Sequence, residues 1–207
     1  MSSPKVHSIV FDIGNVVVRW DPLLIVQRTF GTSEPAEPLR DAIFGHPLWL
    51  KLNRGELTEP EAKLAYADLL GLTPVILDQL FFHIKDSQAL RKETIALMQN
   101  LQAQNFRLFA LTDNVHEIVH YLKQTYPFWS MFENATVSAE IGALKPSAEI
   151  FHHLLDTNNL NAEQTVFFDD VPKNVEGAKR VGMNAFVFSD AASALTDLQS
   201  LGITASI

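Results

Sequence analysis

The sequence predicts an α/β protein in which a doubly wound parallel sheet carries helices on both faces and an all-helical module is inserted near the N-terminus. Short apolar runs, rich in β-branched and aromatic residues and bounded by turn or capping residues, predict buried strands at 6–11, 106–112, 135–138, 165–168 and 185–188. From residue 106 onward these strands alternate with helical patterns at 117–124, 148–156, 175–181 and 194–201. Such alternation is typical of parallel βαβ units.

The segment from residue 22 to about residue 104 breaks this alternation, because it contains several helix starts and no convincing strand. A single crossover helix between neighbouring strands needs far fewer residues. We therefore expect residues 21–87 to form a helical cap, and residues 1–20 and 88–207 to form the sheet domain.

Three helix starts are predicted within or beside this cap. The run from Thr58 to Glu61 has the spacing of a capping box with Pro in the first turn. Thr73 precedes Pro74 as a second cap, and Ser87 is expected to cap a helix that runs through Leu97 and returns to the sheet.

Composition and charge narrow the class of protein. A hydrophobic content of 47% with 19% charged residues is ordinary for a globular chain. The net charge of −8 argues against nucleic acid or an anionic membrane as the main partner, and any phosphate site would need local cations. Cysteine is absent, which excludes thiolate chemistry. Without a signal-peptide pattern or a membrane-length apolar run, we expect a cytoplasmic monomer or homodimer.

Two segments with reactive side chains follow predicted strands, at the sheet edge where open α/β folds bind ligands. Asp12 comes directly after the first strand, where a carboxylate can act as nucleophile, metal ligand or helix cap; Gly14 and Asn15 tolerate unusual backbone angles. The second segment ends in Thr112-Asp113-Asn114. Its hydroxyl and backbone N–H groups suit a phosphate oxygen, although the same residues would also make a good N-cap.

Two further segments add charge. Lys145 stands before Pro146, which opens a helix, so its ammonium can either reach across the sheet edge or remain in solvent. Asp169 and Asp170 directly follow a strand, and two adjacent carboxylates are costly without a cation or hydrogen bonds. Mg²⁺ prefers a few carboxylates together with waters and substrate oxygens. The alternative is an acidic turn that caps the helix from Asn174.

These four segments, in this order across essentially the whole chain, resemble the haloacid dehalogenase-like (HAD) hydrolase superfamily, in the branch with a helical cap after the first motif. The resemblance implies a Rossmann-like core and a Mg²⁺-dependent phosphatase of small phosphorylated metabolites that forms an aspartyl-phosphate. The run Phe-Asp-Ile-Gly-Asn-Val around Asp12 also resembles sugar-phosphate phosphatases of this branch, such as those that act on glucose 1-phosphate.

The resemblance assigns the nucleophile and the metal ligands. Asp12 would be the nucleophile and would bind Mg²⁺ together with the backbone carbonyl of Gly14 and the carboxylate of Asp170. Asp169 would lie behind the metal or pair with Lys145.

The resemblance also assigns the phosphate contacts. Thr112 and the amide of Asp113 would hold the phosphoryl oxygens, with Asn114 nearby. Lys145 would neutralise both the nucleophile and the phosphoryl group, and Asn174 would supply a further contact.

One position departs from the family pattern. Phosphatases of this family usually carry a second aspartate two positions after the nucleophile as general acid and base, and this chain has Gly14 there. A positioned proton donor contributes a factor of roughly 10² to 10⁴. Three alternatives follow: the leaving group needs little protonation, water or a cap residue donates the proton, or the reaction is slow. Asp21 is the nearest other carboxylate, but its place before Pro22 is more typical of a turn.

Four cap residues at near-helical spacing could reach a substrate: His46, Trp49, Asn53 and Arg54. We favour a structural interpretation, with Trp49 in the cap core and a helix end at Arg54.

Two rival functions stay open. A metal-independent 2-haloacid dehalogenase would use Asp12 as a nucleophile toward carbon. Gly14 is compatible with this activity, but a site without metal gives no reason for the Asp169–Asp170 pair. The second rival is a non-catalytic binding protein of the HAD fold, and Gly14 is the only residue that supports it.

Overall fold

The sheet of this protein is parallel throughout and has five strands in the order β3-β2-β1-β4-β5. The computed structural model describes residues 6–31 and 35–207. The strands are β1 (Ser8–Phe11), β2 (Arg107–Thr112), β3 (Asn134–Val137), β4 (Thr165–Asp169) and β5 (Asn184–Val187). Each lies close to its predicted position, so the predicted α/β class with a Rossmann-like sheet is confirmed.

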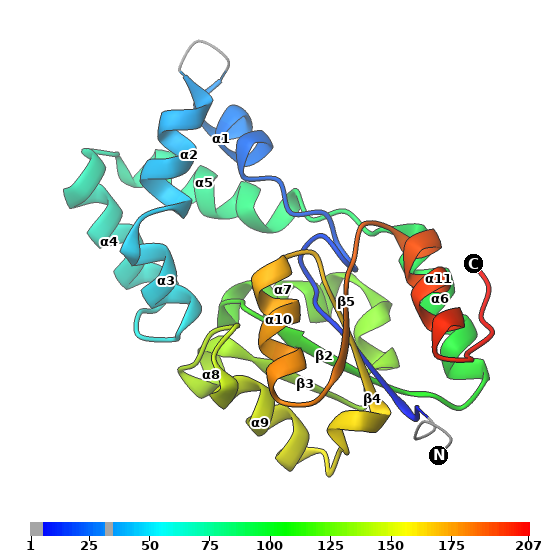
Figure 1. Cartoon of the computed structure of the whole chain (residues 1–207). Helices are drawn as coiled ribbons and strands as arrows, with labels where there is room; N and C mark the ends of the chain where they lie inside the picture. Colours follow the sequence, from blue (N-terminus) through cyan, green and yellow to red (C-terminus); the bar gives the residue numbers. More distant parts are fainter. Residues whose placement is uncertain (1–5, 32–34) are drawn as a thin grey trace.

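Helices cover both faces of this sheet. The sheet-domain helices are α6 (Lys92–Ala103), α7 (His116–Thr125), α8 (Ser138–Ile141), α9 (Ala148–Thr157), α10 (Pro172–Arg180) and α11 (Ala191–Ser200), with short 3₁₀ turns η1 (Pro127–Met131) and η2 (Ala162–Gln164). In Figure 1, α6 and α11 lie side by side, away from α9 and α10.

The alternation of side chains along the strands produces two hydrophobic clusters. Ile9 and Phe11 of β1 pack in the cluster that includes apolar residues of α6, α7 and α11. Val10, between them, packs in the cluster formed with α9 and α10. Because the strand is buried on both faces, its sequence is continuously apolar rather than alternating.

The described residues between β1 and α6 form five helices. They are α1 (Pro22–Phe30), α2 (Ala36–Phe44), α3 (Pro47–Asn53), α4 (Glu59–Leu70) and α5 (Pro74–Asp86), and Figure 1 shows them as a separate group on one side of the sheet domain. We call α1–α5 the cap. The division of the whole chain at residues 21 and 87 stays a prediction. No helix in the described ranges is both long and apolar enough to span a bilayer.

Two of the predicted helix starts are confirmed and one is wrong. Thr58 forms a reciprocal capping box with Glu61, and Thr73 caps α5. Ser87 instead ends α5 as its C-cap, and α6 begins only at Lys92. The intervening residues do not continue a helix because they pair with the segment that leaves β1: Leu90 forms an antiparallel bridge with Val18, and the amide of Arg19 donates to the carbonyl of Ala89 at 2.8 Å.

A buried tyrosine ties two cap helices together. The hydroxyl of Tyr66 in α4 donates to the carbonyl of Ile43 at 2.7 Å, near the end of α2, where carbonyl groups lack intrahelical partners.

We expect Tyr66→Phe to lower the free energy of unfolding by about 1–3 kcal/mol, because it leaves this carbonyl unpaired in the interior. Urea denaturation checks this. The control Tyr121→Phe, at a half-buried site on α7, should change stability by less than about 0.5 kcal/mol, and equal effects of the two changes would contradict the prediction.

Candidate active site

The parallel register brings carboxylates from β1 and β4 together. Phe11 is paired with Phe168 on one side and Ala110 on the other, so Asp12 and Asp169 leave adjacent strands at the same level. The amide of Asp12 continues this ladder by donating to the carbonyl of Phe168 at 2.9 Å. The site therefore lies at the carboxyl edge of the sheet, as the sequence predicted.

Lys145 bridges these two carboxylates. Its Nζ lies 3.0 Å from Oδ1 of Asp12 and 2.7 Å from Oδ2 of Asp169, and only 1% of its side chain is exposed. Burial alone would lower the pKa of Lys145, but the charges of Asp12, Asp169 and Asp113 raise it above its ordinary value. The ammonium thus reaches across the sheet edge as a permanent cation and does not lie in solvent.

Asp169 is fully occupied by hydrogen bonds and ion pairing. Besides Lys145, its oxygens accept from the side-chain amide of Asn174 at 3.0 and 3.1 Å and from the backbone N–H of Val171 at 2.8 Å. The side chain is completely buried. Asp169 therefore orients Lys145, and Asn174 holds Asp169 in place.

The donor set fits a hard divalent cation. Carboxylate oxygens of Asp12, Asp169 and Asp170 lie within 4.8 Å of one another. Because Asp169 is already engaged, Asp12 and Asp170 are the available carboxylates, and Gly14 lines the same pocket. Oxygen ligands of this kind suit Mg²⁺.

The raised pKa values of the carboxyl groups also favour a cation in this site. Burial raises the pKa of Asp12 to about 8; Lys145 opposes this rise and Asp169 adds to it. Burial also raises the pKa of Asp170 and of Asp113. Four carboxyl groups thus face one ammonium group, and a second positive charge would compensate the excess.

The segment that the sequence predicted to bind phosphate forms the loop after β2. Thr112, Asp113 and Asn114 all line the pocket. The carboxylate of Asp113 accepts from the backbone N–H of Lys145 at 3.0 Å, which fixes the lysine loop beside this segment. The capping alternative is not realised, because the N-cap of α7 is Val115 and carries no side-chain cap bond.

Asn15, for which the sequence predicted only a tolerance of unusual backbone angles, also makes side-chain contacts in the site. Its side-chain N–H donates to Oδ2 of Asp170 at 3.0 Å, and its side-chain oxygen accepts from the backbone N–H of Trp20 at 3.0 Å. Its φ of +55° is a left-handed conformation that asparagine tolerates well. The sequence feature that could have predicted these contacts is the position of Asn15 beside Gly14, in the loop that follows Asp12.

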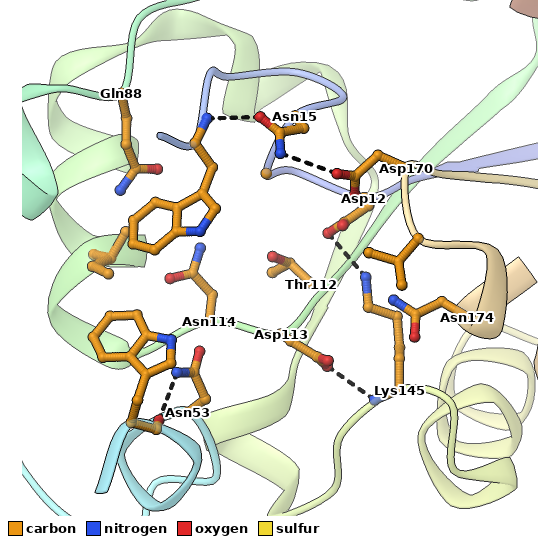
Figure 2. A pocket seen from close by; sticks show the side chains of 15 residues that line it. Asp12, Asn15, Asn53, Gln88, Thr112, Asp113, Asn114, Lys145, Asp170 and Asn174 are labelled. Carbon is orange, nitrogen blue, oxygen red and sulfur yellow. Dashed lines mark hydrogen bonds and ion pairs between the residues drawn. The ribbon is translucent and has the colours of Figure 1, made fainter. Parts of the chain in front are cut away.

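These side chains surround a cavity of about 190 Å³, which every predicted site residue except the buried Asp169 lines. Figure 2 shows Asp12, Asp170, Lys145 and Asn174 on one side of this pocket. The pocket also contains residues that sequence reasoning did not place there or did not favour: Asn15, Trp20, Trp49, Asn53 and Gln88.

The remaining candidates have structural roles. His46 caps α3 through Nδ1, and Arg54 ends that helix. Asp21 caps α1 by accepting from the backbone N–H of Leu24 at 3.0 Å, which agrees with its interpretation as a turn residue. Trp49 does pack inside the cap, but it also faces the pocket, so the purely structural interpretation of this residue was too narrow.

An open parallel sheet with a carboxylate, a buried ammonium group and an acidic pair at one edge defines a hydrolase-like active site. A family model for haloacid dehalogenase-like hydrolases matches residues 7–182, and the chain belongs to this family. It is therefore a hydrolase of the HAD superfamily.

Two of the relatives that match this chain are named as phosphatases. The chain is 24% identical to a sesquiterpene phosphatase (astK) of Aspergillus oryzae, over 93% of this chain and 94% of that protein. It is 23% identical to a D-ribitol-5-phosphate phosphatase of Bacteroides thetaiotaomicron, over 87% and 91% of the two chains. A HAD family enzyme of the same bacterium, solved with magnesium and inorganic phosphate, superposes with a TM-score of 0.76 over 89% of this chain and 95% of that one, at 16% identity.

The buried ammonium group predicts a large stability effect. Lys145→Met would leave Asp169 charged in the interior without its cation, so we expect the free energy of unfolding to fall by about 3–5 kcal/mol in metal-free buffer. Urea denaturation measures the change. The control Lys179→Met breaks an exposed pair with Glu176 and should cost less than about 1 kcal/mol. A similarly small loss for Lys145→Met would contradict the prediction that Asp169 depends on the buried ammonium group.

Proposed function

We propose that this protein is a Mg²⁺-dependent phosphatase of small phosphorylated metabolites, sugar phosphates among them, and that Asp12 is its nucleophile. The contact of Asp12 with Lys145 at 3.0 Å, beside the carboxylate of Asp170, is the observation that carries the proposal. The phosphatase relatives and the magnesium and phosphate bound to a structural neighbour support it.

In this proposal the chain offsets charge before the reaction begins. Asp12, Asp170 and the carbonyl of Gly14 would hold Mg²⁺, and the bound ion would supply positive charge beside the phosphoryl oxygens. Lys145 favours the ionised form of Asp12 against the effect of burial and would face the same oxygens, because its own charge is secured by Asp169. Thr112 and the amide of Asp113 would bind phosphoryl oxygens, with Asn114 and Asn174 at the rim.

The reaction then proceeds in two steps. An oxygen of Asp12 attacks phosphorus in line, the bond from phosphorus to the ester oxygen breaks, and the leaving oxygen takes a proton from water. Water next attacks the aspartyl-phosphate, which releases inorganic phosphate and restores the carboxylate. The cap would limit access of bulk water during the first step.

The phosphatase explains the site better than the two rivals. A dehalogenase that works without metal gains nothing from Asp170 beside Asp12, since both are buried enough for their pKa values to be raised. A binding protein without catalysis would have no need of a buried Lys145 aimed at a carboxylate.

The nucleophile can be tested by an isosteric change. Asp12→Asn keeps the shape and volume of the side chain but removes the attacking oxygen anion, so phosphate release from a panel of sugar phosphates, nucleotides and acyl phosphates should disappear. Wild-type release should also stop with EDTA and return with Mg²⁺. Circular dichroism of the variant should match that of the wild type. Full turnover by Asp12→Asn would refute the assignment, and chloride release from 2-haloacids in EDTA would favour the dehalogenase.

The missing proton donor can be restored. A Cβ at Gly14 would meet Trp20 Cβ at 3.7 Å, an ordinary contact, so Gly14→Asp is compatible with the fold. We expect this change to increase kcat/KM for alkyl phosphates by about 10-fold or more, because a positioned acid contributes roughly 10² to 10⁴. Gly14→Asn, which cannot donate in this way, is the matched control. Equal rates for Gly14→Asp and Gly14→Asn would show that proton donation at this position does not limit the reaction.

A further inference from the structure

The pocket has two chemically different halves. Among the described residues that line it, the charged side chains are those of the sheet edge: Asp12, Asp113, Lys145 and Asp170. Figure 2 shows the carboxamides of Asn53, Gln88 and Asn114 together on the side opposite Lys145. We call this second side the neutral half, because its polar groups carry no charge.

The neutral half has an aromatic wall. Trp20 and Trp49 both line the pocket and stack on each other, with ring centroids 5.8 Å apart and planes 11° from parallel. Phe44 supports the pair by packing edge-on against both, at centroid distances of 5.4 and 5.1 Å. Both tryptophans stay partly exposed, so the stack is available to a ligand.

The polar groups of the neutral half are held in place. The side-chain amide of Asn53 donates to the carbonyl of Trp49 at 2.7 Å, and that of Gln88 donates to the carbonyl of Ile84 at 3.0 Å. The side-chain oxygen of Asn114 accepts from the backbone N–H of Val115 at 2.9 Å. A carboxamide fixed at one end presents its other end in a defined direction, which favours recognition of a particular ligand.

The aromatic wall and the carboxamides of the neutral half together disfavour a substrate that is charged outside its phosphate. Aromatic faces and carboxamides bind groups that have an apolar surface and neutral hydroxyl or amide functions. A second anionic group in the neutral half would meet no cation among the described residues that line it, and it would face the carboxylates of the sheet edge.

We propose that the neutral half is the leaving-group subsite, that it admits substrates uncharged outside the transferred phosphate, and that Trp20 and Trp49 determine this specificity. The inference rests on the proposed phosphatase function, in which the phosphate occupies the charged half.

A matched pair of esters tests the charge selection. Glycerol 3-phosphate and 3-phosphoglycerate differ in having a hydroxymethyl group or a carboxylate at the far end. The Asp12→Asn protein with Mg²⁺ binds without turnover, so intrinsic tryptophan fluorescence can give Kd for each ester. We expect glycerol 3-phosphate to bind about tenfold or more tightly than 3-phosphoglycerate. Equal Kd values, or binding of neither ester, would overturn the inference; phosphate release by the wild type decides the proposed function separately.

Substitution of Trp49 tests whether the Trp20–Trp49 stack determines substrate specificity. In the otherwise wild-type enzyme, Trp49→Ala should raise KM for glycerol 3-phosphate about tenfold and change kcat much less, because the lost contact lies away from the phosphate. Trp49→Phe, which keeps an aromatic face and guards against misfolding, should recover most of the loss. The inhibition constant of inorganic phosphate should be unchanged in both. Trp129→Phe, in η1 and outside the pocket, is the control. A fall in kcat with unchanged KM, or wild-type KM in Trp49→Ala, would refute the specificity role.

Discussion

The site depends on keeping one ammonium group charged in the interior of the protein. Lys145 is buried, and burial by itself would favour its neutral form. Asp169 prevents this, because it is also buried, is held by Asn174 and the amide of Val171, and lies 2.7 Å from the ammonium. An ion pair so deeply placed contributes little net stability. Its value lies in presenting a fixed positive charge to Asp12 at the pocket that both residues line.

The same arrangement makes the charge state of Asp12 sensitive to what occupies the pocket. Burial and Asp169 raise the pKa of Asp12 to about 8 against the opposing effect of Lys145, so one ammonium does not fully compensate this group of carboxyls. A divalent cation between Asp12 and Asp170 would lower that pKa again, because metal ligands bind in their deprotonated form. In the proposed mechanism, cation binding and ionisation of Asp12 would therefore be linked through the excess of acidic groups at the sheet edge.

Much of this architecture could be predicted because it is encoded locally. Apolar runs mark buried strands, and parallel pairing places whatever follows each strand at one edge, so Asp12, Thr112 and Asp170 could be assigned to one site before their distances were known. Ser87 could not be placed, since pairing of the linker with residues 17–19 overrides its capping preference. Trp20, Trp49 and Gln88 depend on how the cap lies against the sheet domain, which no short-range pattern specifies.

Asn15 connects the part of the site that could be predicted to the part that could not. One end of its side chain holds Asp170 in the charged half, and the other holds the backbone of Trp20, whose ring stacks on Trp49 of the cap. The left-handed backbone at Asn15 is what lets one short side chain span both contacts. A shift of the cap that moved Trp20 would therefore also change the support of Asp170. The contacts of Asn15 thus connect Asp170, one of the carboxylates proposed to hold the cation, with the aromatic stack that includes Trp49 of the cap.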